Sequence, residues 1–239
     1  MYVRLKHTLS SLALEMLQRA PRLRPIAWLL GYVRLAPHGD PVPLEALRRE
    51  AETIGPAGPR GLARMEALGI LERAKGMVRL APEYAAYAPY FGRQVERLGR
   101  ALATLDGMGV RHPAPPLARG ILLFNAGLFF ECHEYLEDVW RPTTGPERNF
   151  YHGIIQAAAA FYHFEKNNLH GARTLMEKAL QKLEAYRPAH MGVNVDRLIV
   201  DLQPWRRRFT SREPGRVLHP REFLRIRGRS QRQPVQVTR

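Results

Sequence analysis

The chain has 239 residues, of which 45% are hydrophobic and 25% are charged. That length allows one large domain or two small ones, with enough apolar side chains for a packed core. The 37 basic and 22 acidic residues give a formal net charge of +15. The excess lies at the ends: residues 37–203 carry 20 basic and 19 acidic side chains, whereas residues 204–239 carry 11 and 2.

The single cysteine, Cys132, excludes an intramolecular disulfide framework and favours a reducing compartment. No stretch approaches the roughly 20 apolar residues that a membrane-spanning helix needs. The basic N-terminal segment is interrupted by Glu15 and lacks a small-residue cleavage site, so it is not interpreted as a signal peptide. We therefore expect a cytoplasmic protein with no stable membrane insertion.

Residues 1–105 are predicted to form an N-terminal helix, a winged-helix-like module and a connecting helix. Apolar residues at helical spacing indicate helices over 1–20, 26–35 and 43–54, and a further helix that ends at Gly69. Two short apolar segments then flank Lys75-Gly76, which is the signal of a β-hairpin. Three helices followed by a hairpin are typical of a winged helix-turn-helix.

The balanced charge of this module does not identify its binding partner. Residues 37–90 contain seven basic and seven acidic side chains, whereas a winged helix that reads DNA usually has a basic recognition helix and wing. Only Arg60 and Arg64 are expected to point outward from the third helix. Packing against another part of the protein, dimerisation and DNA binding all remain open.

Residues 106–116 are rich in Gly and Pro and are predicted to be a linker. Residues 117–208 are predicted to be an all-α bundle, with helices near 116–126, 128–141, 148–167, 170–186 and 194–208. Short connections between these helices imply antiparallel neighbours. The fold class expected for the whole chain is mainly α.

The most informative stretch of this bundle is a helix that carries His133 and Glu137 four residues apart. Both lie on one mostly apolar helical face with Trp140, so both are expected to be partly desolvated. The following helix could supply Gln156 and His163 as partners, and Tyr162 as a wall of a small polar pocket. Glu131, Glu134 and Asp138 are expected to point elsewhere, into solvent.

The segments FNAGLFFECHEYLEDVW and FYHGIIQAAAAFYHFEKNNLHGARTLMEKALQKL resemble the DUF309 family over roughly residues 117–208. The resemblance implies a helical bundle but supplies no function. It also singles out the residues of the family motif: Asn125, Gly127, Glu131, His133, Glu134, Glu137, Trp140 and Gln156.

Three interpretations of these residues follow. In the first, His133, Glu137 and Gln156 form a satisfied hydrogen-bond network that pins two helices together. In the second, His133, Glu137 and His163 hold a divalent metal ion and Glu134 acts as the general base of a hydrolase. In the third, the pocket binds a ligand or partner. Cys132 is not expected to act as a nucleophile, because it and His133 point about 100° apart on the helix.

Residues 209–239 are predicted to be a basic, disordered tail that binds a polyanion through phosphate neutralisation, or that is merely solvated. The leading hypothesis is thus a non-catalytic binding or adaptor protein whose partner is nucleic acid or another protein, and the alternative is the metal-dependent hydrolase. The candidate nucleic-acid contacts are Arg60, Arg64, Lys75, Arg206, Arg207, Arg208, Arg225, Arg227 and Arg229.

Overall fold

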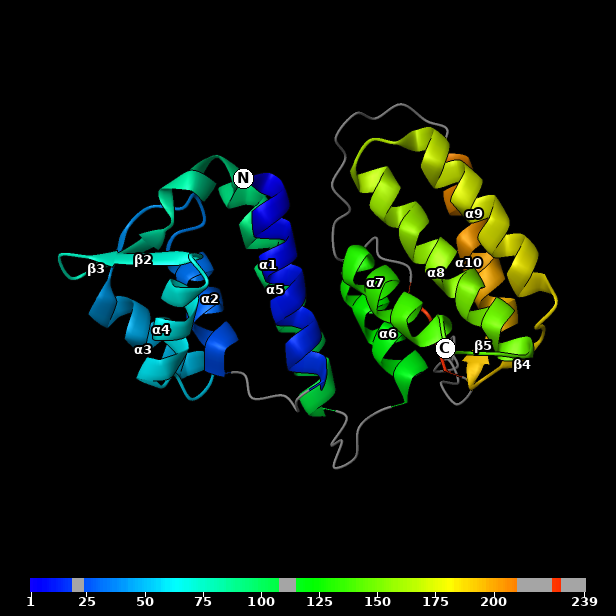
Figure 1. Ribbon diagram of the computed structural model, residues 1–239, viewed down its shortest axis with the longest axis horizontal. Helices are drawn as coiled ribbons and strands as arrows, with labels where there is room; N and C mark the ends of the chain where they lie inside the picture. The colour runs from blue at the N-terminus through cyan, green and yellow to red at the C-terminus, as the bar shows by residue number, and fades with distance from the viewer. Residues whose placement is uncertain (19–23, 108–114, 210–224, 229–239) are drawn as a thin grey trace, which may run out of the picture. The chain divides into compact units, whose positions relative to one another are not determined.

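The computed structural model describes residues 1–18, 24–107, 115–209 and 225–228 (Figure 1). The chain divides into two compact units, Met1–Ala114 and Pro115–Arg239. Ten α-helices lie within the described residues, and none of them is long and apolar enough to cross a membrane.

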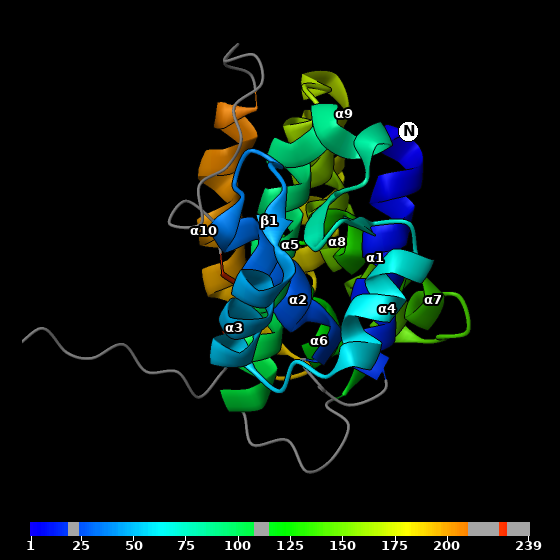
Figure 2. The same ribbon diagram turned by 90° about the vertical axis from the view of Figure 1, so that its left-hand side faces the viewer.

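The N-terminal unit combines helices with a small sheet. Its elements in the described residues are α1 (Tyr2–Gln18), α2 (Arg24–Leu35), β1 (Val42–Pro43), α3 (Leu44–Ile54), α4 (Pro59–Ala67), β2 (Leu71–Ala74), β3 (Met77–Leu80), a 3-10 helix (Pro82–Tyr87) and α5 (Ala88–Gly107). Helices α2, α3 and α4 pack together on one side of the sheet, as the two views show (Figures 1 and 2).

The sheet of this unit is antiparallel, with strand order β1-β3-β2. The turn between β2 and β3 is made by Lys75 and Gly76, whose φ angles of 50° and 75° are both positive. Such a two-residue turn matches the right-handed twist of the flanking strands, which is why Gly is favoured there. The predicted hairpin is therefore present, and β1 adds a third strand that the sequence did not predict.

Tyr32 connects α2 to this sheet. Its ring is fully buried, its hydroxyl oxygen accepts a hydrogen bond of 2.7 Å from the Leu80 N–H, and it lies 2.8 Å from the Gly39 carbonyl oxygen. Burial raises the pKa of the Tyr32 hydroxyl. This contact fixes the hairpin relative to the helices, because a buried hydroxyl left without partners is costly.

The C-terminal unit is a helical bundle with one very short hairpin. Its described elements are α6 (Pro116–Ala126), α7 (Phe129–Trp140), α8 (Pro146–Glu165), α9 (Leu169–Glu184), β4 (Ala189–His190), β5 (Val193–Asn194) and α10 (Val195–Arg208). Helix α8 is the central helix, because residues 153–161 are all buried and both α7 and α9 pack on it. The aromatic core is formed by Phe124, Phe129, Phe161, Trp205 and Phe209.

The prediction of a mainly α chain with a C-terminal helical bundle is confirmed. The strands β1, β4 and β5, of two residues each, and the 3-10 helix were not predicted. The predicted tail differs in part from its expectation: Phe209 and Ile226 are buried, and residues 225–228 pack against the bundle. The rest of that tail, including Arg229, lies outside the described residues.

Candidate functional site

The site lies on α7, and the corner between α6 and α7 sets its position. Gly127 ends α6 with a positive φ of 82°, a conformation that favours glycine. The N–H groups of Gly127 and Leu128 close this corner by donating to carbonyl oxygens in the last turn of α6. Earlier in α6, Gly120 allows this helix to approach Leu136 of α7 closely, because it has no side chain. The motif glycine predicted at 127 is thus a helix terminator.

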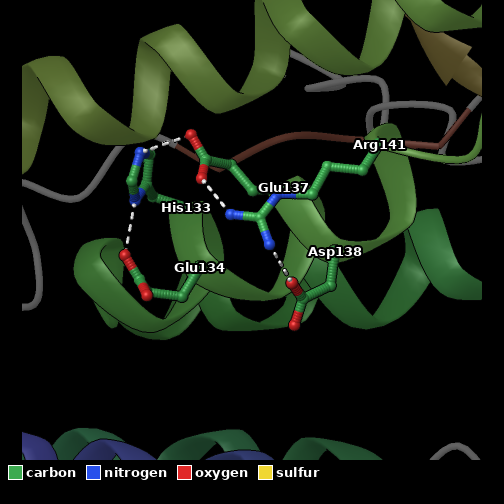
Figure 3. Close-up of polar contacts among 5 residues, drawn as sticks. All are labelled: His133, Glu134, Glu137, Asp138 and Arg141. Carbon is green, nitrogen blue, oxygen red and sulfur yellow. Dashed lines mark hydrogen bonds and ion pairs between the residues drawn. The ribbon is translucent and has the colours of Figure 1, made fainter.

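His133 belongs to a chain of polar contacts that runs from Glu134 through Glu137 and Arg141 to Asp138 (Figure 3). Its Nδ1 lies 3.2 Å from Glu134 Oε1, and its Nε2 lies 3.2 Å from Glu137 Oε1. Glu137 Oε2 in turn accepts from Arg141 Nη2 at 3.4 Å, and Arg141 Nη1 donates to Asp138 at 3.2 Å. The contact of Nδ1 with Glu134 has hydrogen-bond geometry, whereas the contact of Nε2 with Glu137 is an ion pair when the imidazole is protonated.

This network is half-exposed rather than enclosed. The side chains of His133, Glu134 and Glu137 are 27%, 45% and 33% exposed. Water therefore screens the contacts, and each ion pair of this kind contributes only about 0.2–1 kcal/mol. The expected partial desolvation of His133 and Glu137 is present, and their ion-pair partners come from α7 and from Arg141 just beyond its end.

The end of α7 carries a second group of contacts around Trp140. The guanidinium of Arg148 lies 4.1 Å from the centre of the Trp140 ring and donates to the carbonyl oxygens of Trp140, Arg141 and Thr143. Arg148 thereby satisfies carbonyl groups that the helix end leaves without intrahelical donors. This role could not be predicted from the sequence, because an arginine at the start of a helix is indistinguishable there from a solvated cation.

His152 also packs against Trp140, with ring centres 5.0 Å apart. Burial, followed by the positive charges of Lys182 and Arg148, lowers the pKa of His152. The neutral imidazole is therefore the form that the fold favours.

Gln156 was expected to be the partner of His133, but no hydrogen bond joins these two in the part of the chain that the structure describes. The Gln156 side chain is 8% exposed, and its Oε1 is buried without a hydrogen-bond partner. The Nε1 atom of Trp140 is also buried without a hydrogen-bond partner. The first interpretation, a network that pins α7 to α8 through Gln156, therefore requires a contact that is not formed.

The three predicted metal ligands do not form one group: His133 and Glu137 are side by side, but no third ligand joins them among the described residues. His163 Nδ1 lies 2.8 Å from Asn168 Nδ2, at the end of α8 where Asn168 caps α9. Tyr162 lies beside it and packs on Phe130, with ring centres 5.2 Å apart. Within the described ranges, no group of three His, Cys, Asp or Glu side chains is placed to hold a metal ion.

Glu131 was expected to be solvated and is instead buried, with 3% of the residue exposed. The reason is that α7 packs against both α6 and α8, so two faces of the helix are covered rather than one. Cys132 is fully buried, and burial together with the charge of Glu131 raises the pKa of its thiol. A buried thiol of this kind is inert, in agreement with the expectation that it is not a nucleophile.

Two of the three basic residues predicted on the winged-helix-like module lie free at its surface. Arg60 and Lys75 are exposed, and no ion pair involves them among the described residues. Arg64 instead pairs with Glu15 of α1. The neighbouring Arg73 and Arg79 of the hairpin pair with Glu66 and Glu72, each at 3.2 Å.

The basic residues predicted at the other end lie on α10 and on the short segment 225–228. Arg206, Arg207 and Arg208 are exposed in the last turn of α10. Arg206 also lines a groove of about 310 Å³ between α9 and α10, together with Glu177 and Glu184. Arg225 is exposed and Arg227 is half-buried.

A protein family described as "Domain of unknown function (DUF309)" matches residues 117–175. The C-terminal helical unit of this chain thus contains a DUF309 domain, as the motif predicted.

Two curated proteins are similar to parts of the chain. The first is the uncharacterized protein YpuF of Bacillus subtilis (strain 168), which is 37% identical over 78 residues, covering 31% of this chain and 45% of YpuF. The second is an uncharacterized protein of Aquifex aeolicus (strain VF5), 28% identical over 89 residues, covering 37% of this chain and 27% of that protein. The chain therefore spans less than half the length of either relative. No solved structure matches it.

Proposed function

We propose that the chain is a non-catalytic binding protein whose basic C-terminal end contacts a polyanion such as nucleic acid. The observation that carries this proposal is a difference in how the arginines are paired. Arg141, Arg173, Arg187 and Arg197 of the bundle all pair with carboxylates. Arg206 and Arg225 form no ion pair among the described residues.

The composition of this end supports the same function. Residues 204–239 hold 11 arginines and two acidic residues, so most guanidinium groups there cannot find a carboxylate within the segment. Arginine neutralises phosphates, and each contact releases condensed counterions, so affinity falls steeply with salt and depends little on base sequence. The free thiol of Cys132 fits a reducing compartment such as the cytoplasm.

For the N-terminal unit we propose a winged-helix fold that docks a protein rather than reading DNA. Its order of helix, strand, two helices and hairpin, with strands arranged β1-β3-β2, supports that fold. DNA readout requires guanidinium groups that are available to phosphates and bases. The ion pairs of Arg64, Arg73 and Arg79 occupy those groups, which leaves Arg60 and Lys75 as the cations of the predicted reading surface.

The metal-dependent hydrolase is the second candidate. The contact between His133 Nε2 and Glu137 Oε1 favours it, because it places two ligand types side by side, with Glu134 next to them. A third ligand is needed, and the described residues do not supply one. Elemental analysis of the purified protein and of H133A tests this candidate. A stoichiometric metal that is lost from a folded H133A would replace our proposal.

The polyanion proposal is tested by a salt titration with a labelled single-stranded oligonucleotide. The variant replaces Arg206, Arg207 and Arg208 with Gln, and the matched control replaces the exposed Arg48, Arg49 and Arg173 with Gln. Each lost phosphate contact reduces the slope of log K against log salt by about 0.7, so three lost contacts flatten it by about 2. The control should retain the slope of the unmodified protein.

Two results would contradict the proposal. If both variants lose the same affinity, the attraction is a diffuse effect of net charge and not a site. If the unmodified protein does not bind the oligonucleotide even at about 50 mM salt, where such contacts are strongest, the polyanion function is wrong.

A further inference from the structure

Asn125 of the DUF309 motif holds a segment that lies 101 residues away in the sequence. Its Nδ2 donates to the Ile226 carbonyl oxygen at 3.0 Å, and its Oδ1 accepts from the Ile226 N–H at 2.7 Å. The segment 225–228 is the short red part of the ribbon in Figure 1. One amide side chain thus satisfies both backbone groups of one residue, as a neighbouring β-strand would.

The β4–β5 hairpin completes this arrangement. The N–H of Asn194 donates to the Arg227 carbonyl oxygen at 3.1 Å, and Val193 forms an antiparallel bridge with Gly228. The segment therefore lies alongside β5, joined to the two-stranded sheet by one antiparallel bridge and one further main-chain hydrogen bond. This is the geometry by which proteins recognise extended peptides through main-chain hydrogen bonds.

The side chains of the segment follow the alternation of an extended strand. Ile226 is 3% exposed, whereas its neighbours Arg225 and Arg227 remain accessible to solvent to different degrees. Main-chain hydrogen bonds do not depend on the side chain, so the burial of the Ile226 side chain would provide the selectivity. Position 228 has room for a larger side chain than glycine. A Cβ there would lie 3.6 Å from its nearest atom, the Gly192 carbonyl oxygen, which is an ordinary van der Waals contact.

We propose that Asn125 and β5 form a binding site for an extended peptide with an aliphatic anchor residue, and that residues 225–228 of this chain are its resident ligand. The site recognises the same segment when it is supplied as a separate molecule. This inference does not depend on whether the basic end binds a polyanion.

The test uses the full chain with its resident ligand displaced. The I226D variant places a carboxylate at a position that is 3% exposed, so we expect the segment to leave the site while the sequence of the bundle that precedes it is unchanged. A fluorescent peptide of sequence Leu-Arg-Ile-Arg-Gly-Arg, copied from residues 224–229, is then titrated by polarisation. The I226D variant should bind this peptide, and the unmodified protein should bind it more weakly by about tenfold or more, because the tethered segment competes at an effective concentration near millimolar.

Asn125 is tested in the same background. The Asn125→Asp change keeps the acceptor for the Ile226 N–H but sets a second oxygen against the Ile226 carbonyl oxygen. Combined with I226D, it should lower the affinity for the peptide by about tenfold, because one hydrogen bond is lost. The matched control is Asn149→Asp, an exposed position on α8, which should leave the affinity unchanged. A peptide methylated on the Ile nitrogen should fail to bind, because it lacks the N–H that Asn125 accepts.

A second measurement needs neither the peptide nor I226D. Hydrogen exchange of the Ile226 amide should be slow in the unmodified protein and in N149D, and faster by about tenfold in N125D. The proposal is overturned if I226D does not bind the peptide, if the N-methylated peptide binds equally well, or if the Ile226 amide exchanges at the same rate in N125D. If the unmodified protein does not bind the oligonucleotide but I226D binds the peptide, only the polyanion function is contradicted.

Discussion

The close approach of α6 to α7 depends on the missing side chain at Gly120. A Gly→Ala change inside a helix normally stabilises it by about 0.5–1 kcal/mol. At Gly120, however, an added Cβ would lie 2.4 Å from Cδ2, 2.5 Å from Cγ and 2.7 Å from Cδ1 of Leu136. Non-bonded carbon atoms do not approach so closely, so the Leu136 side chain or the α6 backbone must move.

Leu136 has little room to move, because it is completely buried. Overpacking of this kind costs about 1–3 kcal/mol, which outweighs the helix propensity that alanine adds. We expect G120A to lower the free energy of unfolding by about 1–2 kcal/mol. The matched control is G92A in α5, where the nearest atom, Val33 Cγ1, lies at 3.6 Å. That variant should be more stable by about 0.5–1 kcal/mol.

Urea unfolding followed by far-ultraviolet circular dichroism measures both variants. A double-mutant cycle with L136A gives an independent reading, because shortening Leu136 removes the clash. Leu136→Ala should therefore cost less in the G120A background than in the unmodified protein, by about 1 kcal/mol or more. The reasoning is refuted if G120A is as stable as G92A, or if the effects of G120A and L136A simply add.

Three further predictions concern the titratable groups of the bundle. The H133Q variant should lose less than about 2 kcal/mol of stability in urea unfolding, because its two ion pairs are screened, and a larger loss would mean a buried network. Because the pKa of His152 is lowered, the fold binds fewer protons than the unfolded chain, so stability is complete above the unfolded pKa of about 6.5 and declines as the pH falls below it. H152Q should flatten that decline, and an unchanged pH profile would exclude this histidine as its source. The Cys132 thiol should react with a disulfide reagent only as fast as the bundle opens, so rapid labelling of the folded protein at neutral pH would contradict its burial.

The helices could be predicted because each one buries a stripe of apolar side chains, and that stripe has the helical period. The hairpin was predictable from Lys75-Gly76, since both residues adopt the positive φ that this turn requires. Strands of two residues, such as Val42–Pro43, are too short to show any alternation. They exist because a neighbouring strand pairs with them, which is tertiary information.

The candidate site was predictable only in its residues and not in its contacts. A single-face description of α7 placed Glu131 in solvent, but a helix that packs on two neighbours buries more than one face. The same description placed Glu134 in solvent. Its side chain is 45% exposed, but its Oε1 also lies 3.2 Å from His133 Nδ1, although adjacent positions diverge on a helix. The Asn125 contact with Ile226 is beyond any local pattern, since it joins parts of the chain 101 residues apart.

The DUF309 motif has the appearance of one active site, but in this chain its residues do separate structural work. Gly127 stops α6, whereas Asn125 in the same corner turns its amide outward to hold another part of the backbone. One turn into α7, His133 contacts two carboxylates of its own helix, and Trp140 at the end of that helix lies beneath a guanidinium. A catalytic constellation requires its groups to converge on a point where a substrate can sit. The polar contacts of Asn125 and His133 instead lie within the chain itself, and this supports the binding function that we propose.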